Sequence, residues 1–288
     1  MKKIKFIPVL CCMLLASCGL VDFSEDCVYD GNLDIRLNWN YLLEGDKQPR
    51  EADLLIYTLP VRSHTISGDT ILKQIPEGIH TLLALNKPDG VQYNLDEADF
   101  ATATLPVSTQ DEKRYIGQAP IIYADKKEAT IVAGQTTQCE IIPVSCIRQV
   151  IIDFVISDNG VALEVDKISG ELSGVQYGYS FARMEAIPSD AVLQYTSKQQ
   201  KPGLFRSSNI VFGMNPDKDS KTAPDNILEV DLRLSDGTYH HTIIDLTKQF
   251  EGFMSPLIHI TLEVRLGLLG MEAEVTGWQT GEEGNIEI

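Results

Sequence analysis

Positive charge is scarce in this chain: 24 lysines and arginines stand against 41 aspartates and glutamates, which gives a net charge of -17 over 288 residues. A nucleic-acid partner is therefore not expected, because a phosphate backbone binds a basic surface. The acidic excess indicates a soluble surface and assigns no function of its own.

Motifs of catalysis and of metal binding are missing as well. The chain contains no Gly-x-Ser-x-Gly, no His-Glu-x-x-His, no P-loop and no Cys-x-x-Cys. The acidic stretch that starts at Asp217 is not an EF-hand, because Thr222 and Leu228 stand where that loop needs Gly and Glu. The sequence therefore predicts no enzyme, no metal, no cofactor and no small-molecule substrate. A glycosidase that uses two ordinary carboxylates stays open as an alternative.

Tryptophan is rare and histidine carries no pattern. Trp39 and Trp278 fall in or beside expected strands, where packing is a commoner role than sugar binding. His240 and His241 are adjacent and would point to opposite faces of a strand. His259 falls on the polar side of its strand. His80 falls within an expected strand and His64 in an expected loop. We expect all five histidines to be surface side chains.

Long apolar runs are absent except at the N-terminus. Phe6 to Ala16 is an apolar run of 11 residues after three lysines, too short to span a bilayer and typical of a signal peptide. The following Leu15-Ala16-Ser17-Cys18 resembles the lipobox of bacterial lipoproteins, in which the cysteine is lipidated and becomes the first residue after cleavage. We therefore predict lipidation of Cys18 and a membrane attachment that acyl chains make effectively permanent. An ordinary secreted protein is the alternative.

Three further cysteines remain after cleavage: Cys27, Cys139 and Cys146. An odd number leaves at least one free thiol. Cys139 and Cys146 would lie ~23 Å apart on one continuous strand, beyond disulfide reach, so they can pair only if the chain turns near Pro143. Cys27 is an alternative partner for either one, and three buried free thiols are the simplest interpretation.

Alternating apolar residues predict β-strands along most of the chain. The first strand runs from Leu33 to Tyr41, with Leu33, Ile35, Leu37, Trp39 and Tyr41 on its buried side. Turn residues separate the strands that follow. In the first half these strands are expected at residues 53–59, 71–74, 79–85, 119–123, 129–133 and 138–144.

The second half repeats this pattern from Cys146. Residues 146–156 alternate between two faces that are both largely apolar in the middle, as in a central strand. Asp158-Asn159-Gly160 marks a hairpin, and Asp236-Gly237 predicts a two-residue type I′ turn between strands 228–234 and 239–246. Another strand covers 258–266 and is followed by the alternating residues Met271, Ala273 and Val275, while 95–103 and 245–251 are the helical candidates. Short strands and frequent turns predict an all-β fold of β-sandwich type.

The expected organisation has four parts. Residues 1–17 form the signal peptide and residues 18–30 an acidic tether, and a β-sandwich follows on each side of a boundary near residue 145, over 31–145 and 146–288.

The lipobox, the strand pattern and several local segments together resemble a known family. In the first half these segments are Asp26-Cys27-Val28-Tyr29-Asp30 and Ile75-Pro76-Glu77-Gly78. In the second half they are Phe212-Gly213-Met214-Asn215-Pro216, Leu234-Ser235-Asp236-Gly237-Thr238, Asp245-Leu246-Thr247 and Val275-Thr276-Gly277-Trp278-Gln279. Their order and spacing cover nearly the whole mature chain and resemble the FimB-like fimbrial subunit and anchor lipoproteins of Bacteroidetes.

This resemblance implies a fold, a location and a partner. Family members consist of two tandem transthyretin-like (Greek-key) sandwiches on the outer membrane, and they form or anchor surface fimbriae by adding a β-strand from a neighbouring subunit. An exchangeable edge binds such a strand through backbone hydrogen bonds, so no catalytic residue is needed. The expected partners are other fimbrial subunits and, through Cys18, the membrane.

The resemblance also implies a question about proteolysis. Stalk subunits lose their lipid and first strand to an arginine-specific protease, whereas anchors keep both. Arg36 lies inside the expected first strand and should be protected. Arg50 lies in the loop after that strand and is the candidate processing site. We predict that Arg50 is not cut, because the strand before it resembles permanent core.

Two other functions stay open at this point. A surface glycan-binding lipoprotein would need exposed aromatic residues lining a groove. A hydrolase would need acids or a Ser/His pair converging in a pocket.

Overall fold

The computed structural model describes residues 29–43, 45–157, 164–215, 225–267 and 270–281. Cys18, Cys27, the signal peptide, the acidic stretch from Asp217 and the Asp158-Asn159-Gly160 turn lie outside these residues, so the predictions made for them are not addressed by the fold. None of the helices in the described residues is long and apolar enough to cross a membrane.

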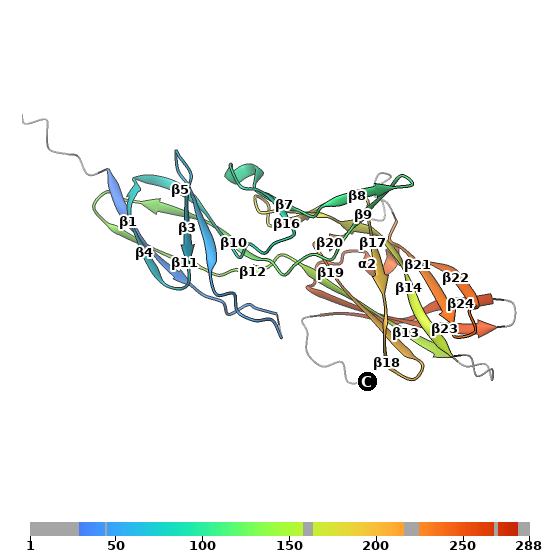
Figure 1. Cartoon of the computed structure of the whole chain (residues 1–288). Coiled ribbons are helices and arrows are strands. Elements are labelled where there is room, and N and C mark those ends of the chain that lie inside the picture. The colour runs from blue at the N-terminus through green and yellow to red at the C-terminus, as the bar shows by residue number, and fades with distance from the viewer. Residues whose placement is uncertain (1–28, 44, 158–163, 216–224, 268–269, 282–288) are drawn as a thin grey trace, which may run out of the picture.

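Two sheets form the sandwich at the N-terminal end of the molecule (Figure 1). Sheet A has the order β11 (Thr136–Ile141), β1 (Asp30–Leu37), β4 (Thr70–Pro76). Sheet B has the order β12 (Val144–Ser145), β10 (Tyr123–Ile131), β5 (Gly78–Leu85), β2 (Ala52–Tyr57), β3 (Arg62–Ile66). A core of fully buried aliphatic side chains fills the space between the two sheets, among them Leu33, Ile35, Leu54, Ile56 and Leu82.

A segment between β5 and β10 leaves this sandwich and joins strands of the C-terminal half. Its first strands belong to sheet C, in the order β16 (Glu185–Ile187), β15 (Gly178–Ser180), β7 (Thr102–Thr104), β6 (Gln92–Asn94). Its last strands form a hairpin, β8 (Val107–Gln110) and β9 (Lys113–Ile116), and β9 pairs in parallel with β17 (Ala191–Thr196). Residues on the N-terminal side of the expected boundary at 145 therefore complete sheets of the other half (Figure 1). The division of the chain at residue 145 stays a prediction.

The C-terminal half contains two larger sheets. Sheet D has the order β22 (Tyr239–Asp245), β21 (Ile227–Leu234), β14 (Val165–Gln176), β17, β9, β8, and β20 (Gly213–Met214) pairs with β14. Sheet E has the order β18 (Lys198–Lys201), β19 (Leu204–Val211), β13 (Arg148–Ser157), β23 (Leu257–Gly267), β24 (Gly270–Gly281). The only helices in the described residues are the 3-10 helix η2 (Ala98–Phe100) and the short α2 (Thr247–Phe250). The predicted all-β sandwich fold is confirmed.

The central strand β5 is buried on both faces. Leu82 and Ala84 point into the core between sheets A and B, whereas Leu83 and Leu85 belong to a second core that continues through the C-terminal half. The segment between β5 and β10 contributes Leu95, Ala101, Ala103 and Leu105 to this second core. The segment between β5 and β10 therefore covers the face of sheet B that would otherwise expose apolar side chains to water.

Strand predictions held where alternation was long and uninterrupted. The strands 146–156, 228–234, 239–246 and 258–266 correspond to β13, β21, β22 and β23. The strand expected at 129–133 is the end of a longer strand, β10, which runs from Tyr123 to Ile131, and the strand expected at 119–123 was wrong because β10 begins only at Tyr123. The helix expected over 95–103 was also wrong, because only η2 is helical there and β7 begins at Thr102.

The first strand is shorter than the alternation predicts. Leu33 and Ile35 are fully buried, but β1 ends at Leu37, and Leu37 and Trp39 are only half-buried. Tyr41 lies in a turn and is 64% exposed, so its assignment to the core was wrong.

The turn at Asp236-Gly237 is not the two-residue type I′ turn that was expected. The amide of Gly237 donates to the carbonyl of Leu234 at 3.0 Å, and the amide of Leu234 donates to the carbonyl of Thr238 at 2.9 Å. Gly237 has φ of +88°, whereas Asp236 does not adopt a positive φ. This pattern is a three-residue loop with a β-bulge, in which only the glycine needs the left-handed region.

A two-residue type I′ turn occurs instead between β8 and β9. Gln110 pairs with Lys113, and the two residues between them have positive φ: +48° at Asp111 and +66° at Glu112. A left-handed conformation costs a residue with a Cβ atom about 1–2 kcal/mol, and glycine avoids this cost.

We expect Glu112→Gly to raise the free energy of unfolding by about 0.5–1 kcal/mol, because the relief of left-handed strain exceeds the extra chain entropy of glycine. Urea unfolding of the purified chain measures the change. Glu128→Gly is the matched control, since Glu128 is an equally exposed glutamate within β10. It should destabilise the protein. Stabilisation by both substitutions, or by neither, would contradict the turn assignment.

Candidate strand-exchange site and polar surfaces

The first strand, β1, is the central strand of sheet A. It pairs in parallel with β11 from Asn32–Thr136 to Leu37–Ile141, and antiparallel with β4 on its other side. Removing it would open a groove between β11 and β4 and would expose the side chains that Leu33 and Ile35 cover. Losing one such buried aliphatic side chain typically costs 2–5 kcal/mol, so β1 is a large part of the stability of this sandwich.

Close backbone approach fixes where β1 begins. A Cβ atom on Gly31 would lie 2.5 Å from the carbonyl oxygen of Val132 and 2.8 Å from a methyl group of Ile131. The β1–β4 ladder also shifts its register between Gly31 and Leu33. Only glycine fits at this point, where β1 enters the sheet.

The loop after β1 is held by Tyr123 at the start of β10. The hydroxyl of Tyr123 accepts a hydrogen bond from the amide of Leu43 at 2.8 Å and donates to Asp46. The ring of Trp39 packs edge-on against Tyr123, with 6.3 Å between the ring centroids. Trp39 thus has the predicted packing role, whereas Trp278 in β24 is 46% exposed and does not.

The two arginines near the first strand differ in backbone protection. Arg36 pairs with Glu140 within the β1–β11 ladder. Arg50 is exposed in a bend just before β2, and its side chain has no hydrogen bond or ion pair with the described part of the chain. A protease that binds an extended substrate could therefore reach Arg50 far more easily than Arg36. Whether Arg50 is cut stays a prediction.

The two described cysteines, Cys139 and Cys146, are not joined to each other. Cys146 is fully buried, and burial raises the pKa of its thiol to about 12. Cys139 in β11 is only partly buried.

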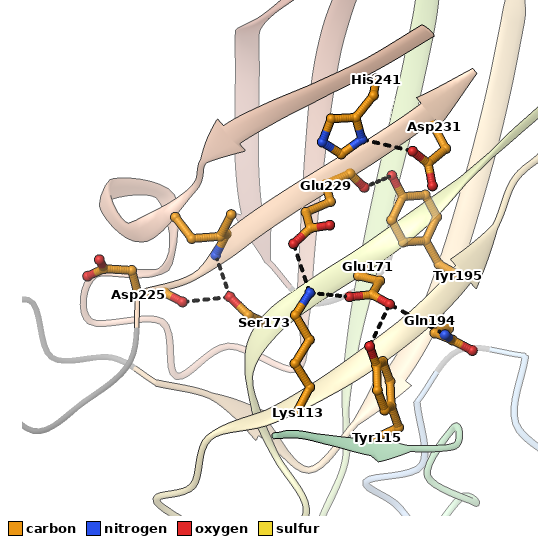
Figure 2. Close-up of polar contacts among 11 residues, drawn as sticks. Lys113, Tyr115, Glu171, Ser173, Gln194, Tyr195, Asp225, Glu229, Asp231 and His241 are labelled. Atoms are coloured by element: carbon orange, nitrogen blue, oxygen red, sulfur yellow. Dashed lines mark hydrogen bonds and ion pairs between the residues drawn. The ribbon is translucent and has the colours of Figure 1, made fainter. Parts of the chain in front are cut away.

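A polar surface on sheet D ties the β8–β9 hairpin to the C-terminal half (Figure 2). The ammonium group of Lys113 donates to Glu171 on β14 at 2.7 Å and to Glu229 on β21 at 3.0 Å. Tyr115 donates its hydroxyl hydrogen to the other oxygen of Glu171 at 2.9 Å. Burial opposes ionisation of Glu171, but the hydrogen bonds from Lys113 and Tyr115 outweigh it and lower the pKa of the carboxyl group. Glu171 is therefore an ionised structural partner and not a proton donor at neutral pH.

The histidine side chains that form hydrogen bonds bind separate partners. His241 bonds Asp231 on the neighbouring strand through Nδ1 at 2.8 Å (Figure 2), and His80 bonds the carbonyl of Pro76 through Nε2 at 2.7 Å. His64 lies in β3, so its assignment to a loop was wrong. Among the described residues no three His, Cys, Asp or Glu side chains are placed to hold a metal ion.

The expectation that His259 is a surface side chain was wrong. His259 is 8% exposed, and its Nε2 lies 2.9 Å from Asp153 on the adjacent strand. Arg206 on β19 binds both oxygens of the same carboxylate, each at 2.7 Å. Burial raises the pKa of Asp153, but the bonds from Arg206 and His259 outweigh this and bring it down to about 2. Three neighbouring strands of sheet E are thus joined through one buried carboxylate.

Solved structures share this architecture, although no protein-family model and no curated protein matches the chain. A candidate adhesin from Bacteroides ovatus superposes with a TM-score of 0.60 at 13% identity, over 83% of this chain and 90% of that chain. The fimbrial anchor protein Mfa2 from Porphyromonas gingivalis has a TM-score of 0.54 at 10% identity, over 88% of this chain and 100% of that chain. A candidate polysaccharide-binding protein from Bacteroides thetaiotaomicron has a TM-score of 0.52 at 11% identity, over 88% and 98%.

This chain has the fold of Bacteroidetes fimbrial anchor and adhesin proteins. The resemblance drawn from the lipobox and the local segments is confirmed at the level of fold. Identities of 10–13% establish the fold alone, so the function is argued from the chain's own surfaces.

We expect Asp153→Asn to lower the free energy of unfolding by about 2–3 kcal/mol at pH 7, because Arg206 and His259 then lack their anionic partner. A carboxyl group whose pKa is lower in the folded chain contributes stability above its unfolded pKa near 4 and loses it as pH falls. The wild type should therefore lose stability between about pH 4 and about pH 2.

Urea midpoints at pH 7, 4 and 2.5 measure both effects. Asp166→Asn is the matched control, because Asp166 and Arg233 form an exposed pair that should contribute little. Equal losses in the two variants would contradict the buried role of Asp153.

Proposed function

We propose that this chain is a non-enzymatic outer-membrane lipoprotein, attached through lipid on Cys18, that serves as a fimbrial anchor or accessory fimbrial subunit. It joins neighbouring subunits by β-strand addition. The observation that carries the proposal is the position of β1, the strand nearest the lipidation site, at the centre of sheet A. The fold shared with the fimbrial anchor protein Mfa2 supports it.

An anchor has to keep the link between its lipid and its folded body. In this chain that link runs through β1, which is paired on both sides and contributes two fully buried side chains to the core. Such a strand supports an anchor that retains its first strand, in contrast to a stalk subunit that loses it.

The edge strand β8 supports strand addition as the mode of assembly. β8 ends sheet D within the described residues, and its four residues Val107, Ser108, Thr109 and Gln110 are exposed and uncharged. Because Gln110 and Lys113 close a two-residue turn, alternation of the ladder directs the amide and carbonyl groups of Val107 and Thr109 away from β9. Charged side chains usually block such edges, as Lys198 and Lys201 do on β18.

A glycan-binding role is the second candidate. The fold shared with a candidate polysaccharide-binding protein supports it, as does the exposed ring of Tyr239 on sheet D, whose hydroxyl donates to Asp231. Specific signals for the purified chain on a glycan array would favour this role over strand addition.

The anchor assignment predicts that protein from the native cell surface begins at a lipidated Cys18 and retains Arg50 within an intact chain. Intact-mass spectrometry and N-terminal sequencing measure both features. A chain that begins at Glu51 would show removal of β1 and would reassign the protein as a stalk subunit.

Strand addition at β8 predicts that Thr109→Pro lowers the amount of other fimbrial subunits cross-linked to this protein in outer membranes by about three- to tenfold. Proline removes one outward amide, and a backbone hydrogen bond contributes roughly 1 kcal/mol. Thr109→Ala is the matched control, because it changes the same side chain and keeps the amide. Quantitative mass spectrometry measures the cross-linked subunits, and equal amounts for both variants would exclude β8 as the accepting edge.

A further inference from the structure

A cavity of about 180 Å³ lies in the C-terminal half, and none of its lining residues belongs to β1 or β8. It is bounded by the start of β13, the end of β14, the strand β16 with the residues that flank it, the strand β20 and the segment after α2. Its walls include Arg148, Gln176, Met184, Met214, Phe253 and Met254.

Most of the wall is apolar and adaptable. Three methionines contribute to it, together with Ala186, Pro188 and the buried ring of Phe253. Methionine side chains are flexible and polarisable, so they can adjust to an apolar group of varied shape. Met254 is 65% exposed, which places it at the mouth of the cavity.

Arg148 brings a positive charge to this apolar wall. Its side chain is half-buried and forms no hydrogen bond or ion pair with any of the described residues. The titratable groups that influence its pKa are Tyr179 and Cys146, and burial raises the pKa of both, so both are neutral. Glu185 also lines the cavity, and its carboxylate is bound by Arg183 at 2.7 Å. A partly desolvated guanidinium without an anionic partner is costly, and an anion entering the cavity would remove that cost.

Gln176 adds an amide to the same wall. Gln176 is 5% exposed, and the one hydrogen bond of its side chain to another described residue is a long contact of 3.5 Å with Asn215. Gly213, opposite Gln176 on β20, leaves space for this amide, because a Cβ atom there would lie 2.1 Å from the amide oxygen. The Gly213-Met214-Asn215 segment therefore shapes the cavity. The glycine at position 213 is explained by the room that the Gln176 amide needs.

We propose that this cavity binds a carboxylate that carries a short apolar group, with Arg148 binding the carboxylate and the methionines surrounding the apolar part. Guanidinium and carboxylate match in geometry as well as in charge. The volume suits such a ligand, since an apolar cavity of roughly 150 Å³ holds a benzene molecule. Two sources have this chemistry: a free carboxylic acid, and the C-terminal carboxylate of a partner protein with an apolar last residue.

The test uses the mature chain with ¹³C-labelled methionine methyl groups and two probes. One probe is 4-methylpentanoate, and the other is the peptide Gly-Ser-Gly-Ser-Leu with a free C-terminal carboxylate. We expect saturable shifts of the Met184, Met214 and Met254 methyl signals, with Met271 on β24 unchanged as an internal reference. Binding of 4-methylpentanoate alone or of both probes indicates a free acid, and binding of the peptide alone indicates a partner's C-terminus.

Variants test the role of the charge. Arg148→Gln should weaken binding at least tenfold, whereas Arg114→Gln should leave it unchanged, because Arg114 is exposed and paired with Asp190. Met254→Glu adds a negative charge at the mouth on an exposed side chain, so it should also weaken binding at least tenfold without affecting folding. The proposal is overturned if neither probe gives saturable shifts, if Arg148→Gln binds as wild type, or if the C-terminally amidated peptide binds as well as the acid.

Discussion

The burial of sheet B on both faces is the constraint on which the rest of the structure depends. An antiparallel sheet can expose one face to water, but here Leu83 and Leu85 of β5 make the outer face apolar. The segment between β5 and β10 covers that face with small and aliphatic side chains and so removes it from water. The same segment then has to return to β10, and on its way it supplies β8 and β9 to sheet D. One packing requirement in the N-terminal half thereby determines the edge of a sheet in the C-terminal half.

Sequence-based prediction succeeded for strands that are long and whose apolar pattern is set by their own burial. β13, β21 and β23 alternate over eight or more residues, and their positions were predicted closely. β6 to β9 are three or four residues long and largely polar, and only β7 and β9 pair with distant strands, β15 and β17. Such strands have no periodicity to detect, since their stability comes from tertiary pairing. The first strand was predicted too long because alternation continues to Tyr41 after the backbone has turned away.

Candidate sites show the same limit. Cys18 and Arg50 stay predictions from local sequence, because a lipobox and an arginine in a loop are local features. The side of the strand on which His259 lies was also predicted correctly. Its burial was not, because the neighbours that surround it are Asp153 and Arg206 on two other strands. The unpaired state of Arg148 is likewise invisible in sequence, since it depends on which groups the fold brings near it.

The position of β1 has a mechanical consequence. A pull applied to the chain ahead of Asp30 acts along the axis of β1, and the ladders with β11 and β4 flank the strand on both sides. Under such a load the hydrogen bonds of both ladders bear the force together in shear, instead of opening one after another as they would if the strand were peeled from an edge. The proposed attachment through Cys18 would therefore load the strand in the direction in which sustained tension is resisted best.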